Sequence, residues 1–300
     1  MMQSVQAALK AVALGQPLSE GINRTAVSSV RIFKSSSVTQ PMQSVYEPSL
    51  FVVVQGAKVV VTGDRTFAYD ASHYLVSTAF MPVSGTIVTA SAAEPFLSYQ
   101  ITFTMEQLFE AMEAFAVAPS KVRTAAPAIH AAPFSEALLD AVYRLVGLLH
   151  APEDIPVLEK LYLNEILYRL LVTEANAALR QLAYMEGNAY RIARTIVYIN
   201  AHLYERLSVD ALAAHAKMSV SVFHRHFKSV TQVSPLRYVK MQRLQNAKRL
   251  MVSENMDVSG ASFHVGYQSV SQFSREYTEY FGRCPSEDVK RFRQEWTGPF

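Results

Sequence analysis

The sequence contains few of the residues from which many functional sites are built. Among its 300 residues Cys284 is the only cysteine, which excludes an internal disulfide framework and any metal site made of several thiolates. Only 18% of the residues are charged and 50% are hydrophobic, a balance that excludes a disordered chain. Long apolar runs are missing too, since none reaches the roughly 18 residues of a membrane span. We therefore expect a soluble protein with one large domain or two ordinary ones.

Signatures of targeting and catalysis are also missing. The first 16 residues carry Lys10 inside their apolar part and lack a basic start, which disfavours a secretory signal. The chain has no Gly-rich phosphate loop, no nucleophile elbow, and no group of His, Asp and Glu at metal-ligand spacing. We therefore expect no catalytic residue, no metal, no cofactor and no membrane partner. The expected location is the cytoplasm.

The charge is distributed unevenly along the chain. Residues 1–190 contain 12 Lys and Arg against 16 Asp and Glu, a net charge of −4. Residues 191–300 contain 16 against 9, a net charge of +7. This asymmetry favours a C-terminal part that binds a polyanion, although charge alone leaves a solvated basic face as the alternative.

Short runs of β-branched and aromatic residues dominate the segment 27–103. Residues 50–55 and 58–62 are two such runs separated by Gly56 and Ala57, a spacing that predicts a hairpin. Further runs follow at close spacing with turn residues between them, at 66–70, 73–77, 85–90 and 96–103. Several short strands of this kind predict a small barrel or a sandwich.

The pattern becomes helical after Thr104. Apolar residues recur at helical spacing in 105–116, 134–150 and 157–182, and the Ala-rich stretch 116–133 is predicted to be a connector. Everything after residue 190 is helical in pattern. Strands followed by helices predict a multi-domain α+β chain. Its expected parts are a domain at 20–183 (strands about 27–103, helices about 105–182), a linker at 184–189 and an all-α domain at 190–295.

Two similar blocks about fifty residues apart make up the all-α part. Each block, 208–235 and 258–285, combines a short helix, a brief turn, a serine placed to cap a second helix, and aromatic residues that anchor it. This combination is typical of a helix-turn-helix. In each second helix the aromatic side chains point inward, so polar residues occupy the opposite face. Arg, Gln, Ser and His on such a face can contact base edges in a DNA major groove.

The segment between the blocks, residues 235–254, is predicted to form one helix. About 19 helical residues span roughly 30 Å, and successive major grooves on one face of DNA are about 34 Å apart. This helix therefore suits the presentation of both blocks to one face of a duplex. Two tandem blocks joined in this way are a much more specific signal than one.

These features resemble the AraC/XylS family of bacterial transcription regulators. Residues 190–295 are similar to the family's DNA-binding domain, and VGYQSVSQFSREYTEYFGRCP in the second block matches its signature closely. The segments 46–61 and 63–77 are similar to the cupin-like sensor half of one branch of the family. The resemblance implies an N-terminal cupin-like barrel or sandwich with packed helices, which holds an effector or a dimer contact. It also implies a double helix-turn-helix reader that recruits or blocks RNA polymerase.

The resemblance also implies which residues contact DNA. Its base-facing positions fall in the first block on Ser221, His224 and Arg225, with Lys228 toward phosphate. In the second block they fall on Ser271, Gln272 and Arg275, with Gln268 and Ser269 near the DNA backbone. The implied partners are an operator duplex, RNA polymerase, a small-molecule effector and a second copy of the chain in a homodimer. The implied location is the nucleoid.

The sequence departs from the family pattern at a few positions. Gln232 replaces the usual Gly after the first recognition helix, and Gly260 interrupts a helix that is normally Ala-rich. Thr278 and Glu279 stand where the second recognition helix often has a basic pair. A pair between Arg275 and Glu279 at i, i+4 would compete for the guanidinium that should face a base. We therefore expect the first block to dominate DNA affinity.

A few residues outside the recognition helices invite functional interpretations. Tyr46 and Tyr99 are candidates for lining an effector cavity, and core packing is the favoured alternative. His73 has no His-x-His near it, and one ligand is too few for a metal cupin site. Cys284 precedes Pro285 at the start of the last helix, where capping or packing is favoured over a redox role.

The sequence is therefore compatible with three functions. The first is a transcription regulator controlled by a small-molecule effector bound in the N-terminal domain. The second is a constitutive DNA-binding regulator whose β-domain only dimerises. The third is a cupin-type enzyme with a DNA-tethering domain, which the lack of a metal triad disfavours.

Overall fold

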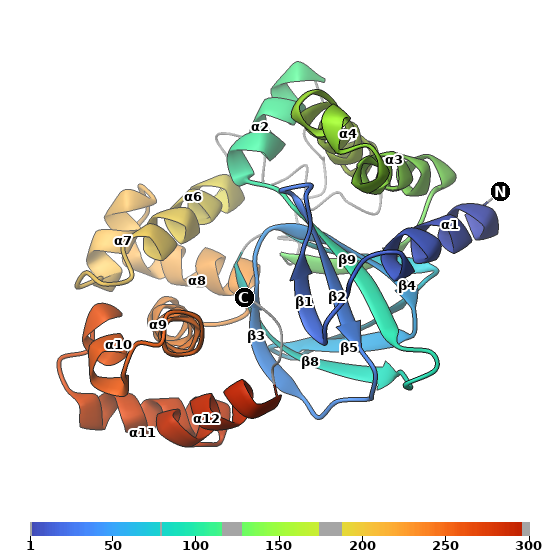
Figure 1. The fold of residues 1–300 in the computed structure, drawn as a ribbon. Coiled ribbons are helices and arrows are strands. Elements are labelled where there is room, and N and C mark those ends of the chain that lie inside the picture. The colour runs from blue at the N-terminus through green and yellow to red at the C-terminus, as the bar shows by residue number, and fades with distance from the viewer. Residues whose placement is uncertain (1, 79, 116–127, 174–187, 296–300) are drawn as a thin grey trace.

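The computed structural model describes residues 2–78, 80–115, 128–173 and 188–295 (Figure 1). An N-terminal part made of two antiparallel sheets and packed helices lies beside a C-terminal part that is helical throughout its described residues. This arrangement confirms the predicted multi-domain α+β fold, with a barrel-like β domain and an all-α domain that contains two helix-turn-helix units.

Neighbouring strands are antiparallel in both sheets. The first sheet has six strands in the order β1-β2-β9-β4-β7-β10, and the second has four in the order β3-β8-β5-β6. Every strand run predicted between residues 50 and 103 forms a strand. The bounds are β1 Gly21–Arg24, β2 Val30–Ser35, β3 Met42–Tyr46, β4 Ser49–Gln55, β5 Ala57–Thr62, β6 Arg65–Asp70, β7 His73–Ser77, β8 Met81–Thr89, β9 Phe96–Thr102 and β10 Ile129–Pro133.

The predicted hairpin between β4 and β5 is wrong. β4 pairs with β7 and β9 in the first sheet, whereas β5 pairs with β6 and β8 in the second. Gly56 is the corner at which the chain passes from one sheet to the other. It has a φ of +82°, and a Cβ there would lie 2.4 Å from the carbonyl oxygen of Thr89. Only glycine fits a corner with this backbone angle and this little space.

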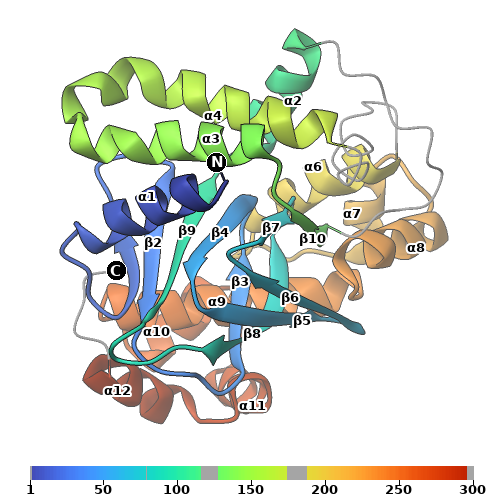
Figure 2. The same ribbon diagram turned by 90° about the vertical axis from the view of Figure 1, so that its right-hand side faces the viewer.

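In the described residues the helices that accompany the sheets are α1 Met2–Leu14, α2 Met105–Ala114, α3 Glu136–Gly147 and α4 Ile155–Val172, with short 3-10 turns at Leu148–His150 and Pro152–Asp154. Figure 2 shows α1, α3 and α4 together on one side of the sheets and the last helices of the chain on the other. The predicted connector 116–133 is partly wrong, because its end forms β10 and pairs with β7. Its residues 116–127, and the end of the predicted helix beyond residue 173, lie outside the described residues.

The C-terminal part is a run of helices joined by short turns. The bounds are α6 Asn188–Ala201, α7 Val209–His215, α8 Val220–Thr231, α9 Pro235–Ser253, α10 Val258–His264, α11 Val270–Phe281 and α12 Pro285–Glu295. α7 with α8 forms the first helix-turn-helix unit, and α10 with α11 forms the second. In Figure 1, α8 and α11 lie on either side of the connecting helix α9.

The hydrophobic cores do not follow the domain boundary that the sequence predicts between the β domain and the all-α domain. Buried residues of the β domain, among them Val60, Val83 and Ile129, belong to one continuous cluster with Phe223 and Phe227 of the first unit. The backbone amide of Ala128 also donates to the carbonyl oxygen of Val230 at the end of α8, at 3.4 Å. The second unit has a cluster of its own. The first unit is therefore packed onto the β domain, and the second is joined to it through α9.

Candidate nucleic-acid interface

The first unit is held by caps and by an aromatic core. Ser208 caps α7, its hydroxyl accepting from the amide of Ala211 at 3.2 Å. On α8, Phe223 and Phe227 are fully buried at i and i+4, and Phe227 meets Tyr238 of α9 edge to face with ring centroids 5.5 Å apart. These contacts fix which side of α8 faces outward.

The outward side of α8 carries the predicted DNA contacts of the first unit. Ser221, Arg225 and Lys228 are exposed, and His224 is half-buried on the same side. His226 turns away and makes a 3.0 Å hydrogen bond to the side-chain amide of Asn188. Burial, with a smaller contribution from Arg225, lowers the pKa of His226. His226 therefore has a structural role at this end of the first unit.

The second unit repeats this construction. Asp257 caps α10, its carboxylate accepting from the amide of Gly260 at 3.0 Å. A Cβ at Gly260 would lie 2.6 Å from that carboxylate, which explains the glycine in a helix that is otherwise Ala-rich in the family. Ser269 caps α11 through the amide of Gln272, and Phe273 is fully buried in the unit's core.

The outward side of α11 carries the predicted contacts of the second unit. Gln268, Ser269, Ser271, Gln272 and Arg275 are all exposed. None of these five belongs to the unit's buried core. The structure thus leaves the predicted residues of both units accessible outside the buried cores, with His224 half-buried among them.

The acidic residues of α11 do not pair as expected. Glu279 lies 3.3 Å and Glu276 lies 3.6 Å from the ammonium of Lys240 on α9. Glu276 also accepts from the hydroxyl of Tyr267 at 2.9 Å. Arg275 forms no ion pair with any acid in the described part of the chain. The pair between Arg275 and Glu279 that the sequence suggested is therefore replaced by the pair between Lys240 and Glu279. The guanidinium of Arg275 is free to face DNA.

Both recognition helices end on a left-handed residue. Gly282 follows α11 with a φ of +76°, and Gln232 follows α8 with a φ of +62°. Gln232, at the position where the family usually has Gly, therefore has a left-handed backbone, and its side-chain amide donates to the carbonyl oxygen of Ser229 at 2.9 Å. Gly63 in the turn between β5 and β6 packs against it, since a Cβ at Gly63 would lie 2.8 Å from the Cβ of Gln232.

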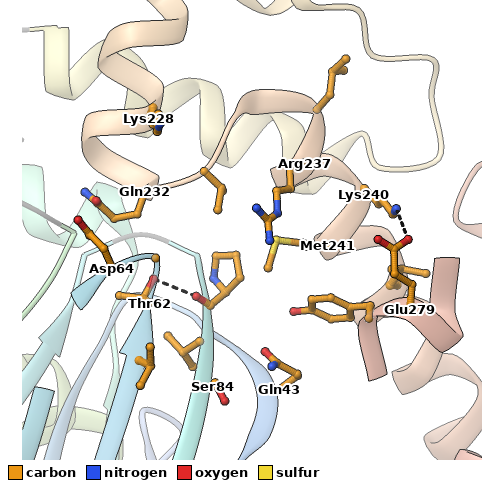
Figure 3. Close-up of a pocket in the computed structure, with 18 of the residues that line it drawn as sticks. Gln43, Thr62, Asp64, Ser84, Lys228, Gln232, Arg237, Lys240, Met241 and Glu279 are labelled. Carbon is orange, nitrogen blue, oxygen red and sulfur yellow. Dashed lines mark hydrogen bonds and ion pairs between the residues drawn. The ribbon is translucent and has the colours of Figure 1, made fainter. Parts of the chain in front are cut away.

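A cleft of about 1130 Å³ lies between part of the second sheet and the helices α8, α9 and α11 (Figure 3). Gln43, Thr62, Asp64 and Ser84 line it on the sheet side, and Lys228, Arg237, Lys240 and Glu279 line it on the helical side. Apolar packing between the β domain and the second unit is absent from the described core clusters. The second unit is thus held in place by α9 and by contacts within the all-α part.

A smaller cavity of about 180 Å³ lies within the β domain. Tyr46 lines it, and its hydroxyl lies 3.2 Å from that of Tyr69. Burial raises the pKa of Tyr69, and the neighbouring Tyr46 acts in the same direction. The predicted companion Tyr99 does not line this cavity; it is fully buried, and its hydroxyl donates to the carbonyl oxygen of Leu9 at 2.8 Å.

Lys58 of β5 is the residue of this cavity that the sequence interpretation missed. Its ammonium lies 5.2 Å from the ring centroid of Phe33 and 5.5 Å from that of Tyr46. The other cation of the lining, Arg31, is paired with Glu47. Lys58 forms no ion pair within the described residues. The sequence signal that could have identified Lys58 is a single charged residue within an otherwise apolar strand run.

The structure also bears on the metal and membrane questions. Residues 2–78, 80–115, 128–173 and 188–295 contain no group of three or more His, Cys, Asp or Glu side chains that could hold a metal ion. His73 makes local contacts, with the carboxylate of Asp70 at 3.3 Å and with the hydroxyl of Ser72 at 2.8 Å. In the same part of the chain, no helix is long and apolar enough to cross a membrane.

Two exposed recognition helices on a shared connecting helix define the class of this protein: a DNA-binding transcription regulator with a tandem helix-turn-helix. Comparisons with known proteins name the family. Residues 26–178 match the AraC-type transcriptional regulator N-terminus, and residues 212–291 match a helix-turn-helix domain. The first match alone covers just over half of the chain, so the chain belongs to the AraC-type family of transcriptional regulators.

Individual relatives match only part of the chain. The transcriptional regulator YobQ of Bacillus subtilis is 34% identical over 91 residues, which is 30% of this chain and 38% of that protein. The transcriptional activator RhaS of Escherichia coli O157:H7 is 25% identical over 160 residues, covering 53% of this chain and 56% of RhaS. The chain thus spans about half the length or less of these curated relatives.

Solved structures share the fold at low identity. Wild-type ToxT from Vibrio cholerae with a bound unsaturated fatty acid superposes with a TM-score of 0.58 at 12% identity, covering 87% of this chain and 94% of ToxT. ToxT bound to (E)-4-(8-methylnaphthalen-1-yl)but-3-enoic acid gives a TM-score of 0.60 at 10% identity, covering 87% and 97%. This likeness extends over both the β domain and the all-α domain.

Proposed function

We propose that this chain is a one-component regulator that reads operator DNA with both helix-turn-helix units at once. The observation that carries the proposal is the pair of exposed polar faces, each with an arginine, on either side of a 19-residue connecting helix. Such a helix is about 28 Å long, which suits recognition helices that enter successive major grooves about 34 Å apart. Half-site contacts of this kind read bases and phosphates together.

The proposed contacts follow from the exposed faces. Ser221, His224 and Arg225 read bases in one groove, and Lys228 contacts phosphate. In the second groove Ser271, Gln272 and Arg275 read bases, and the helix start at Gln268 and Ser269 lies against the DNA backbone. The two arginines are the strongest discriminators because a guanidinium can donate two hydrogen bonds to guanine.

A salt titration of the intact chain tests DNA reading. Counterion release predicts that log K falls with log salt by about 0.9 per phosphate contacted. Fluorescence anisotropy on a sequence selected from random DNA should show this slope, and Lys228→Ala should reduce it by about one unit. A flat salt response would contradict the proposal.

We further propose that the cavity of the β domain binds a small organic acid as effector. The ammonium of Lys58 lies over two aromatic rings and forms no ion pair with any acid in the described part of the chain, so its charge is available to an anion. A volume of about 180 Å³ is close to that of a cavity that holds benzene. The ligand is therefore about one ring in size. The two ToxT ligands named above are also carboxylic acids, which agrees with this chemistry.

Thermal unfolding tests the effector. A single-ring carboxylate such as benzoate should raise the Tm, since a ligand bound only by the native state stabilises it, whereas benzamide should raise it less. Lys58→Met should remove the difference between acid and amide, and Lys34→Met, on strand β2 of the first sheet, is the matched control. If no acid in a panel raises the Tm, the constitutive regulator with a purely dimerising β domain is favoured instead.

We also propose a homodimer that activates transcription at the nucleoid by contact with RNA polymerase. Val157 and Leu161 lie one turn apart on α4 and are 67% and 57% exposed, which is unusual for aliphatic side chains and typical of an interface. Activation is proposed because RhaS is named an activator. Sedimentation of Leu161→Glu against wild type tests the dimer, and a promoter fusion tests the sign of regulation.

A further inference from the structure

The guanidinium of Arg243 lies at the junction of the two helix-turn-helix units. Arg243 is on α9, and its Nε donates to the carbonyl oxygen of Leu203 at 2.8 Å. Its Nη2 donates to the carbonyl oxygen of Glu205 at 2.6 Å. Both carbonyls belong to the loop between α6 and α7, at the entry to the first unit. The connecting helix is thus hydrogen-bonded to the first unit by one half-buried side chain.

The second unit closes over the same guanidinium. Gly266 lies in the turn between α10 and α11 with a φ of +87°. A Cβ there would lie 3.1 Å from Nη2 of Arg243, 3.2 Å from its Cζ and 3.0 Å from the carbonyl oxygen of Tyr204. The backbones of the two units therefore approach closely at this point, and Arg243 fills the space between them.

The charge of Arg243 is satisfied by this junction and not by an ion pair. No carboxylate in the described residues lies within ion-pair distance of it. Burial lowers the pKa of Arg243, and the hydroxyl of Tyr267 and the carboxylate of Glu276 act in the opposite direction. A partly buried guanidinium without an ion pair keeps its hydrogen bonds to backbone carbonyls, because losing them would leave a charge unsolvated.

The helix α9 fixes the distance between the units, and the core of each unit packs on a different part of α9, the first on Tyr238 and the second on Leu244. A contact that joins the two units directly adds a further constraint on their rotation relative to each other. Their hydrophobic cores form separate clusters, and a cleft separates the second unit from the second sheet. Arg243 with Gly266 is a contact that joins the first unit, the connecting helix and the second unit.

We propose that Arg243 is a positioning residue that fixes the rotation between the two units and so restricts the protein to one spacing between two DNA half-sites. This inference rests on the proposed reading of DNA by both units. One base pair of extra spacing moves a half-site along the duplex and rotates it by about 34–36°, since a turn contains about 10–10.5 base pairs. A rigid pair of units cannot follow both changes, whereas a loosened pair can.

Selection from a random duplex library tests the inference with the full chain. Wild type should select two half-site motifs at a single spacing. Arg243→Gln should select the same two motifs at several spacings. On a selected duplex, one inserted base pair should weaken wild-type binding about tenfold and binding of Arg243→Gln by less than about threefold. A role limited to stability would lower affinity on every duplex and leave the spacing preference intact.

Matched variants keep the test decisive. Arg249→Gln removes an exposed cation from the same helix, one paired with Glu254 at 2.8 Å, and should keep the single spacing. Gly266→Ala perturbs the junction from the opposite side and should relax the spacing as Arg243→Gln does, so the test does not depend on one variant folding. A single unchanged spacing in both variants overturns the inference. A wild-type selection without a two-part motif overturns the two-unit reading, and this inference with it.

Discussion

Lys240 should protect DNA binding by neutralising the acids of the second recognition helix. Its ammonium lies within 3.6 Å of Glu276 and 3.3 Å of Glu279, and these carboxylates are 18% and 73% exposed. Lys240→Ala leaves both carboxylates without a cation on the helix that approaches DNA. It also releases Glu279 to capture Arg275 at i, i+4. We therefore expect weaker binding that has its origin in the second unit.

The magnitude follows from Coulomb's law. A carboxylate about 8 Å from a phosphate in water costs about 0.5 kcal/mol, and screening at 0.1 M salt reduces this by roughly half. Two carboxylates, each near two phosphates, cost about 1 kcal/mol, which is about a fivefold increase in Kd. The loss of one cation from the protein adds a general term that Arg249→Ala on the same helix measures separately.

A double-mutant cycle by fluorescence anisotropy at one salt concentration separates the explanations. Lys240→Ala should weaken binding about fivefold more than Arg249→Ala. In a background that carries Glu276→Gln and Glu279→Gln, Lys240→Ala should match Arg249→Ala. An equal loss from Lys240→Ala in both backgrounds would refute the reasoning, because Lys240 would then contact DNA itself.

Three further predictions follow from the described contacts. Phe227→Ala and Phe273→Ala should each cost about 3–5 kcal/mol of unfolding free energy, but in hydrogen exchange the first should also expose strands of the β domain, whereas the second should expose only α10–α12. Burial lowers the pKa of His215, so stability that is present above the unfolded-state pKa of about 6.5 should fall as the pH drops below it. Urea unfolding of His215→Gln should show a smaller fall between pH 7.5 and 5.5, and an unchanged fall would contradict this. Arg225→Ala should weaken operator binding more than Arg275→Ala, each by about 1–3 kcal/mol, because α8 carries no acid and α11 carries two; an equal or larger loss for Arg275→Ala would show that the second unit docks fully.

The sequence by itself determined the local elements and the recognition surfaces. Short β-branched runs predict β4 and β5, and aromatic residues at i and i+4 predict which side of α8 and α11 is buried. The resemblance to the family marks Gln232 as a replacement for Gly after α8, and its φ is +62°. These features depend on residues within one or two turns of each other, so the periodicity of the chain is enough to specify them.

Only the tertiary structure decided how these elements meet. Gly56 separates two short strand runs, as the turn of a hairpin would, yet it joins two different sheets. The strand β9 that pairs with β4 lies far along the chain, so the residues around Gly56 do not predict that pairing. Glu279 pairs with Lys240, 39 residues away, and not with its neighbour Arg275. Arg243 reaches carbonyls 40 and 38 residues away. Which partners pair depends on how whole elements are placed relative to one another. That placement follows from the packing of hydrophobic cores, and each core combines residues from distant segments of the chain.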